Sequence, residues 1–249
     1  MTKTFAAPVA AILLLLAGRL QASQLADEQN RKEARDHYAL GQAHMRSESW
    51  DRAEAEFRKA IQLDPLFTLA HYSLGQVHMN TRSYASAVVA FTGCKEAFKQ
   101  LAALGAMDSG VAEHQLDQEI RDLRDTINLY QSGTVHTNQP NNMVLKLESR
   151  VAELERMRKR GTVSTDVPAE FSLALGSAYL RSGKLPEAER EYVEAVKVNP
   201  KMGEAYNNLA VVYLNTGRIN EAENAVKQAE KAGFKVHPQL KKDIAARKG

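Results

Sequence analysis

The chain has 249 residues, of which 44% are hydrophobic, 25% charged and 6% aromatic, with 14 glycines and 7 prolines. This length can bury a core in one or two domains, and the glycine and proline content excludes a collagen-like or low-complexity chain. The single cysteine excludes an internal disulfide framework and a multi-cysteine metal site. The formal charge is +3, and without Lys3 and Arg19 of the first 22 residues it is +1, which gives no electrostatic reason to expect a nucleic-acid partner.

The first 22 residues have the pattern of a secretory signal peptide. Lys3 precedes an uncharged, apolar run over residues 4–18, and small residues follow around Ala22. The run is shorter than the roughly 20 residues that span a bilayer as a helix. We therefore expect cleavage after Ala22 and a periplasmic or secreted location. An uncleaved N-terminal membrane anchor is the alternative, because Arg19 directly follows the apolar run.

Four copies of one pattern of large and small residues follow, with a period of 34 residues inside each pair of copies. The pattern is carried by Leu40, Leu74, Leu175 and Leu209, each followed by Gly or Ala, and by Ala53, Ala87, Ala188 and Ala222. Residues 34–101 and 169–236 therefore contain two repeats each, and residues 23–33 are expected to form a lead-in helix. This spacing resembles that of the tetratricopeptide repeat family. The resemblance implies an all-α superhelix in which each repeat is a pair of antiparallel helices and the first helices line the concave side.

Positions within the repeat predict its local structure. We expect the leucine of each copy on the buried stripe of the first helix, and the small residue after it to let the second helix approach closely. Gly183 and Gly217 suit left-handed turns between the two helices. Glu48 and Arg82 stand at the same positions in the first two repeats and predict less regular turns. Ser49 is a candidate N-cap for the helix that follows it.

Residues 102–168 do not fit the repeat and are predicted to form an inserted antiparallel helical hairpin with a linker. The second helix of the second repeat lacks a stop signal and is expected to continue to about Met107. Beyond it, apolar residues alternate in steps of three and four, which is typical of a packed helical seam. They are Leu116, Ile120, Leu123, Ile127 and Tyr130 in one arm, and Val144, Leu147, Val151 and Leu154 in the other. Residues 237–249 are predicted to form a capping helix with a basic tail.

Four histidines, His37, His44, His71 and His78, recur with the same period. Seven helical residues separate two side chains by roughly 10 Å, so no pair on one helix can chelate a metal ion. Only a set from different helices could do so. Because these positions hold buried aromatics in the family that the chain resembles, we expect packed imidazoles and keep metal binding as the less favoured alternative. Cys94 falls at a small core position and is expected to be a buried thiol.

The sequence contains no catalytic signature: it has no phosphate-binding loop, dinucleotide fingerprint, zinc-protease helix or nucleophile elbow. We therefore expect a protein that is not an enzyme and that needs no cofactor or metal. The resemblance implies that residues between the buried positions of the first helices face the groove. The candidate partner-binding residues are Arg35, Tyr38, Gln42, Met45, Arg46, Tyr72, Gln76, Asn80, Arg181, Glu204, Asn207 and Asn215.

These observations favour a non-catalytic scaffold or adaptor that binds an extended peptide or a partner protein on the concave face, in an exported compartment. The alternative is an oligomer-forming structural or assembly factor that works through residues 111–160, for instance as a homodimer. One subclass of the family clamps a partner's terminal carboxylate with Lys and Asn side chains. Of the matching positions in this sequence, Asn208 alone fits, so the resemblance does not support that chaperone-docking role.

Overall fold

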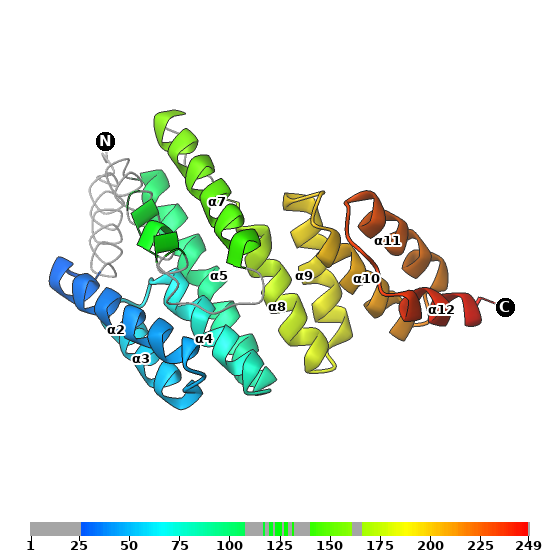
Figure 1. Cartoon of the computed structure of the whole chain (residues 1–249), viewed down its shortest axis with the longest axis horizontal. Coiled ribbons are helices and arrows are strands. Elements are labelled where there is room, and N and C mark those ends of the chain that lie inside the picture. The colour runs from blue at the N-terminus through cyan, green and yellow to red at the C-terminus, as the bar shows by residue number, and fades with distance from the viewer. Residues whose placement is uncertain are drawn as a thin grey trace, which may run out of the picture. The chain divides into compact units, whose positions relative to one another are not determined.

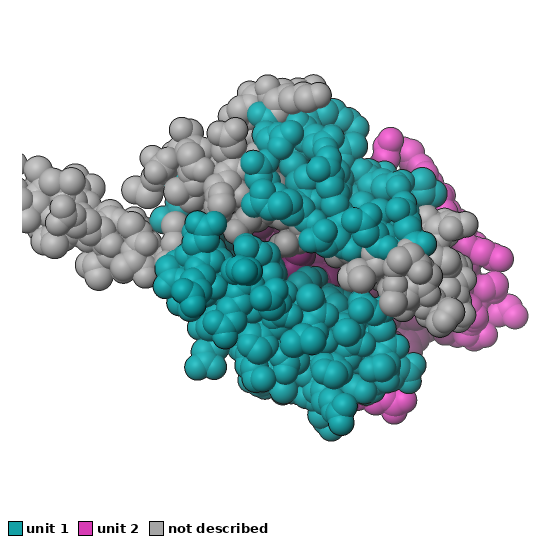
Figure 2. Space-filling model, turned by 60° about the vertical axis from the view of Figure 1, so that its left-hand side comes forward, with its two compact units in different colours: residues 1–67, 100–163 teal, residues 68–99, 164–249 magenta. Residues whose placement is uncertain are grey.

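The computed structural model describes residues 26–107, 117, 120, 121, 123–125, 127, 128, 131, 140–160 and 166–248. Every regular element in this part of the chain is an α-helix (Figure 1), so the all-α prediction is confirmed. The chain forms two compact units, which Figure 2 colours separately: residues 1–67 with 100–163, and residues 68–99 with 164–249. None of the described helices is long and apolar enough to span a membrane. The predicted signal peptide lies outside the described residues.

Each repeat is a pair of helices. Repeat 1 is α2 (Glu28–Arg46) with α3 (Trp50–Leu63), and repeat 2 is α4 (Thr68–Asn80) with α5 (Tyr84–Met107). Repeat 3 is α8 (Ala169–Arg181) with α9 (Leu185–Val198), and repeat 4 is α10 (Gly203–Asn215) with α11 (Ile219–Lys231). The helix α2 begins inside the predicted lead-in segment and continues without a break into the first repeat. The helix α5 ends at Met107, where the sequence predicted its end.

A small residue on the first helix of a repeat receives an aromatic ring from the second helix. A Cβ atom placed at Gly41 would lie 2.6 Å from the Phe57 ring, and one placed at Gly176 would lie 2.8 Å from the Tyr192 ring. The Phe57 and Tyr192 side chains are fully buried. The close approach predicted from the small residues is therefore confirmed, and its physical cause is the space that the ring needs.

Repeats 2 and 3 stack directly on each other within one compact unit, although the inserted segment separates them in the sequence. Ala87 and Phe91 of α5 form one buried cluster with Leu175 and Ala178 of α8. We call this contact junction 2/3. The stack continues through junction 3/4, where Ala188 and Tyr192 of α9 pack with the buried side chains of repeat 4. The sequence places the hairpin between two pairs of repeats along the chain, and in the structure repeats 2, 3 and 4 stack as one continuous array.

The inserted segment pairs its two arms in an antiparallel sense. Ile120, Leu123 and Ile127 are buried against Val151 and Leu154 of α7 (Pro140–Arg160). Arg158 donates to Asp117 (2.7 Å), Arg124 to Glu155 (2.5 Å) and Gln131 to Glu148 (3.4 Å), so residue numbers rise along one arm as they fall along the other. The two other residues assigned to the seam of the first arm, Leu116 and Tyr130, lie outside the described residues.

The helix α12 (Pro238–Ala246) closes the array beyond repeat 4. Ile244 is buried in the core of repeats 3 and 4, and Leu240 packs against the same core. Arg247 donates from Nη1 to the backbone oxygen of Leu214 at 2.9 Å, and Lys248 pairs with Glu223 at 2.6 Å. The predicted capping helix is thus held by both apolar and polar contacts.

Leu40 corrects the prediction for the buried stripe. Its counterparts Leu175 and Leu209 are 3% and 4% exposed because each lies against the second helix of the preceding repeat, whereas Leu40 is 51% exposed. In the described part of the chain α2 is the first helix, and no second helix precedes it. Periodicity assigns the same environment to every copy, but among the described residues the first copy has no preceding helix that would provide it.

The turns of repeats 1 and 2 also differ from the prediction. Glu48 and Arg82 adopt φ angles of 53° and 59°, close to the 74° and 76° of Gly183 and Gly217. The four turns therefore share one left-handed conformation, and two of them hold it without glycine, at a cost of roughly 1–2 kcal/mol each. Ser49 occupies the N-cap position of α3 as predicted, but its side chain makes no capping hydrogen bond.

Candidate partner-binding surface

The residues predicted to bind a partner all lie on first helices, and none of them is fully buried. Asn80, Arg181, Glu204 and Asn215 are exposed. The other eight, Arg35, Tyr38, Gln42, Met45, Arg46, Tyr72, Gln76 and Asn207, are half-buried. Exposure alone therefore divides the set into residues that a partner can reach freely and residues whose side chains also serve the protein's own packing.

Tyr38 of repeat 1 is held by aromatic contacts. Its ring centroid lies 5.7 Å from that of Phe57 and 5.0 Å from that of Phe67. Gln42, one turn further along α2, donates from Nε2 to the Tyr38 hydroxyl at 2.9 Å. The ring is therefore a structural element first, and only its hydroxyl edge together with Gln42 offers polar atoms to a partner.

Tyr72 repeats this arrangement at junction 2/3. Its ring centroid lies 5.5 Å from that of Phe91 and 5.6 Å from that of Phe171, which comes from the next repeat in the stack. Burial raises the pKa of the Tyr72 phenol to about 12, and Glu170 and Glu204 add a smaller effect in the same direction. Gln76 hydrogen-bonds to the phenol. Tyr72 therefore packs against both repeat 2 and repeat 3. The sequence could not reveal this contact, because Phe171 stands 99 positions away.

A partly buried ion pair also belongs to junction 2/3. Lys95 of α5 donates to the hydroxyl of Ser172 at 3.1 Å and to the carboxylate of Glu191 on α9. The Lys95 and Glu191 side chains are only 12% and 19% exposed. Neither residue was singled out from the sequence, since the pairing depends on stacking across the insertion.

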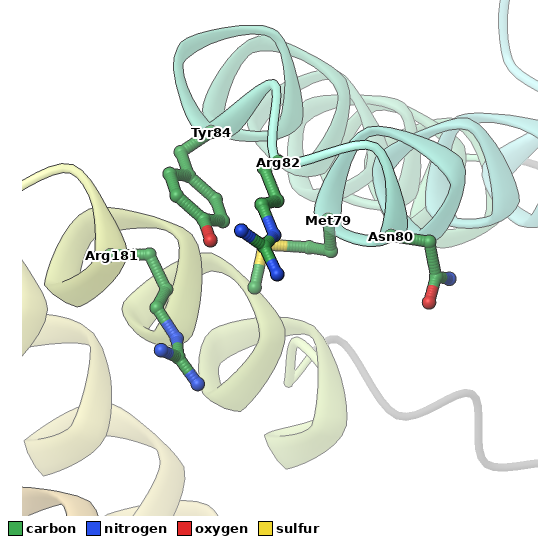
Figure 3. A pocket seen from close by; sticks show the side chains of 5 residues that line it. All are labelled: Met79, Asn80, Arg82, Tyr84 and Arg181. Carbon is green, nitrogen blue, oxygen red and sulfur yellow. The ribbon is translucent and has the colours of Figure 1, made fainter.

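A depression of about 490 Å³ opens where the C-terminal ends of α4 and α8 approach each other (Figure 3). It is lined by Met79, Asn80, Arg82, Tyr84 and Arg181. Asn80 and Arg181 were predicted as partner-binding residues, and the structure brings them to one place. Arg82 and Tyr84 were missed, because Arg82 was interpreted only through the geometry of its turn. The sequence did contain a signal, because Arg82 stands at the repeat position that glycine occupies in repeats 3 and 4.

The arginine at junction 3/4 is neutralised by its own surroundings. Arg218 donates to both oxygens of Glu189, one of them at 2.9 Å, and its guanidinium lies 4.5 Å from the centroid of the Tyr213 ring. The hydrogen bonds to Glu189 raise the pKa of the Arg218 guanidinium further above its ordinary value. This cation is thus occupied by the protein itself and is not available to a ligand.

The histidines take separate roles. His37 bonds through Nδ1 to Glu56 at 2.5 Å, and this hydrogen bond lowers the pKa of the Glu56 carboxyl. The His71 ring packs so closely on Gly93 that a Cβ atom there would lie 2.7 Å from Nδ1. His78 is 4% exposed, and His44 is half-buried in the last turn of α2. Among the described residues, no three His, Cys, Asp or Glu side chains form a cluster that could hold a metal ion.

Cys94 is a free, fully buried thiol in α5. Burial raises the pKa of the thiol well above its ordinary value. A protonated thiol in the core is a poor nucleophile, which agrees with the packing role expected for it.

The seam of the inserted hairpin is filled by the hairpin's own residues. Leu154 is 1% exposed, Ile120 3% and Val151 8%. Leu145 is the large hydrophobic residue of α7 that is exposed among the residues described there. A second copy of the chain would therefore have to displace existing contacts in order to use this seam.

One protein-family model matches the chain, in two segments. Residues 38–92 and 173–234 match the model of the tetratricopeptide repeat. Hsp70-Hsp90 organizing protein 1 of Glycine max is 29% identical over 124 residues, which are 49% of this chain and 20% of that protein. The chain thus spans about a fifth of the length of the curated relatives that it matches.

Two solved structures illustrate the structural likeness. PilW, a widely conserved type IV pilus biogenesis factor, is 15% identical with a TM-score of 0.41, and the match covers 90% of this chain and 88% of that one. YrrB, described as a TPR protein with an unusual peptide-binding site, is 18% identical with a TM-score of 0.31, and the match covers 89% and 95% of the two chains.

Proposed function

Because the chain belongs to the tetratricopeptide repeat family, we propose that it is a non-catalytic scaffold that binds another protein. Binding uses the surface formed by the first helices of its repeats, and the partner presents an extended segment. The relatives named Hsp70-Hsp90 organizing protein support a role that concerns other proteins. The proposal concerns this chain alone, since the match covers only a small part of those relatives.

The observation that carries the proposal is the polarity of the first-helix surface in the array of repeats 2 to 4. Glu170 and Glu204 lie in the first turns of α8 and α10, whereas Arg181 lies in the last turn of α8. Half-buried Gln76 and Asn207 supply amides between these ends. A surface that is acidic at one end and basic at the other favours an extended peptide bound in one direction, because peptide amides and charges can pair along it.

The relatives' chaperone-related name does not extend the proposal to a terminal-carboxylate clamp. The positions of such a clamp in this sequence include Ser73, which is 2% exposed, and Asn208, whose side-chain oxygen accepts a hydrogen bond from Asn207 at 3.3 Å. A buried hydroxyl cannot serve a partner, and one amide does not make a clamp. The partner is therefore proposed by its extended form and charge alone.

An exported location is part of the proposal. It is supported by Lys3, the uncharged run over residues 4–18 and the small residues near Ala22. Fractionation of cells that express the full chain, followed by N-terminal sequencing of the protein recovered, tests it. A mature protein that starts near Ser23 is the expected result. A full-length protein in the membrane fraction would instead favour the anchor, and a full-length protein in the cytosol would reject export.

Site-specific photocrosslinking tests the binding surface. A photoreactive amino acid replaces Gln76 or Asn207 on the first-helix surface, and Val89 on α5, which is 72% exposed, serves as the matched control position. Irradiation of living cells should give an adduct with a second polypeptide from the first two positions and not from Val89. Adducts from Val89 alone, or from none of the three positions, would contradict a binding surface made of first helices.

A further inference from the structure

Lys184 at junction 2/3 and Arg218 at junction 3/4 are cations at equivalent repeat positions, but an adjacent carboxylate pairs only with Arg218. The pair that neutralises the cation of junction 3/4 is Glu189 with Arg218. The residues at the same repeat positions one junction earlier are Val88 and Lys184. Junction 2/3 therefore lacks the carboxylate that its neighbour has, and it carries Arg82 and Arg181 in addition.

Neither of these two arginines has an acidic partner in the described part of the chain. Both line the depression of about 490 Å³, which is open to solvent and has a mainly polar lining. The hydroxyl of Tyr84 in the same depression makes no hydrogen bond among the described residues. Asn80 donates from Nδ2 to the backbone oxygen of Gln76 at 2.9 Å, which fixes its side chain at the rim. Figure 3 shows the Arg82 side chain extending from the turn before α5 and the Arg181 side chain extending from α8, with the Arg181 guanidinium directed away from Arg82 and Tyr84 in this view.

We propose that this depression binds a carboxylate of the partner polypeptide, namely an acidic side chain of the extended segment. The inference rests on the proposed function and specifies the charge of the partner. A guanidinium offers a planar fork of N–H donors that matches a carboxylate, and a tyrosine hydroxyl adds one donor. Met79 provides an apolar wall for the aliphatic part of an acidic side chain.

Charge elsewhere on the surface favours the same orientation. Glu170 and Glu204 lie in the first turns of their helices, at the opposite helix ends from Arg181. They repel a carboxylate from that side, so the acidic part of the segment is directed to the arginines. The site thus fixes the direction in which the segment lies as well as its position.

The test uses the full chain and a defined probe, a fluorescein-labelled (Glu-Ala)5 peptide, with its (Gln-Ala)5 counterpart for comparison. Fluorescence anisotropy should show binding of the Glu peptide and much weaker binding of the Gln peptide. Arg82→Gln and Arg181→Gln should each weaken binding about tenfold, the loss expected for one charge-assisted pair. Arg190→Gln is the matched control, because it removes the same charge from an exposed position on α9 outside the depression.

Equal losses from Arg190→Gln and the two pocket variants would overturn the proposal, because they would show attraction by net charge only. Equal binding of the Glu and Gln peptides, or no binding of either, would overturn it as well. Circular dichroism of each variant verifies that the helices are intact. If first-helix crosslinks form in cells while the Glu peptide fails to bind, the scaffold function stands and only the carboxylate site is rejected.

Discussion

Junctions 2/3 and 3/4 join equivalent surfaces of neighbouring repeats with different chemistry. Junction 2/3 uses Phe171 and the ion pair of Lys95 with Glu191. At the same repeat positions, junction 3/4 has Ala205, Val196 and Ala225, all of which pack in apolar clusters. The backbone stacking is the same in kind, yet one interface is aromatic and charged and the other is small and aliphatic.

This difference follows the connection between the repeats. Repeats 3 and 4 are joined by a short turn, so their apolar surfaces meet without a long loop to close. Repeats 2 and 3 are separated by the whole insertion, and an array of similar helices offers several wrong surfaces on which to stack. A charged pair and a large ring accept fewer partners than alanine and valine do. We therefore interpret the aromatic and charged contacts of junction 2/3 as a means to exclude wrong stacking partners.

The largest expected effect is that of Phe171→Ala. The change removes the ring that contacts Tyr72 and Phe98, and we expect it to lower the free energy of unfolding by about 2–3 kcal/mol, as for a half-buried aromatic residue. Hydrogen exchange should show the loss of protection in α4 and α5 and much less in α10 and α11. Equal loss along the whole array would contradict a weak point at this junction.

The ion pair should behave asymmetrically. Lys95→Val or Glu191→Ala alone leaves one partly buried charge without its partner and should destabilise the protein by about 2 kcal/mol. The double variant installs the residues of junction 3/4 and should recover most of that loss. Urea denaturation of the four proteins gives the coupling energy directly. A double variant as unstable as the sum of the single variants would show that the pair is not coupled.

A smaller loss is expected at junction 3/4 from Arg218→Met. The side chain is 36% exposed, so removal of its contacts with Glu189 and Tyr213 should cost only about 1 kcal/mol. High salt should shrink the difference between the variant and the wild type, because the pair is partly screened by solvent. A loss as large as that of Phe171→Ala would reverse the ranking of the two junctions.

At neutral pH, Tyr72→Phe should cost at most the hydrogen bond between Gln76 and the phenol, about 1 kcal/mol, and its main effect should appear in alkali. The raised pKa of about 12 means that the folded protein keeps the phenol proton to higher pH than the unfolded chain, which releases it near pH 10. The stabilising contribution is therefore complete below about pH 10 and is lost as the pH rises towards 12. Thermal unfolding measured between pH 8 and pH 12, for wild type and Tyr72→Phe, should show a smaller alkaline loss in the variant. Identical pH profiles would contradict a buried phenol.

The helices and the repeat could be predicted because they depend on local pattern. The end of α5 at Met107 and the left-handed Gly183 follow from neighbouring residues alone. The prediction that Leu40 is buried was wrong because burial also depends on a neighbouring repeat. The prediction of a less regular turn at Arg82 was wrong because packing on both sides of a strained turn can maintain its conformation.

The candidate surface was less predictable for the same reason. Periodicity gave the correct helix face for Asn80 and Arg181, but their meeting in one depression requires the stacking of repeats 2 and 3. The sequence assigned Tyr72 to a partner, whereas Phe171 occupies its ring in the folded protein. The repeat pattern does not indicate which side chains meet across an insertion, so these contacts could not be predicted from the sequence.

Because the chain is synthesised from its N-terminus, the two sides of junction 2/3 become available at different times. Lys95 meets Ser172 and Glu191, which follow it by 77 and 96 residues. At about 5–20 residues per second, the ribosome delivers these partners roughly 4–20 s after Lys95 itself. During that interval the side of Phe91 that packs against Leu175 and Ala178 lacks these partners, so this surface of α5 is one that a nascent-chain chaperone would bind.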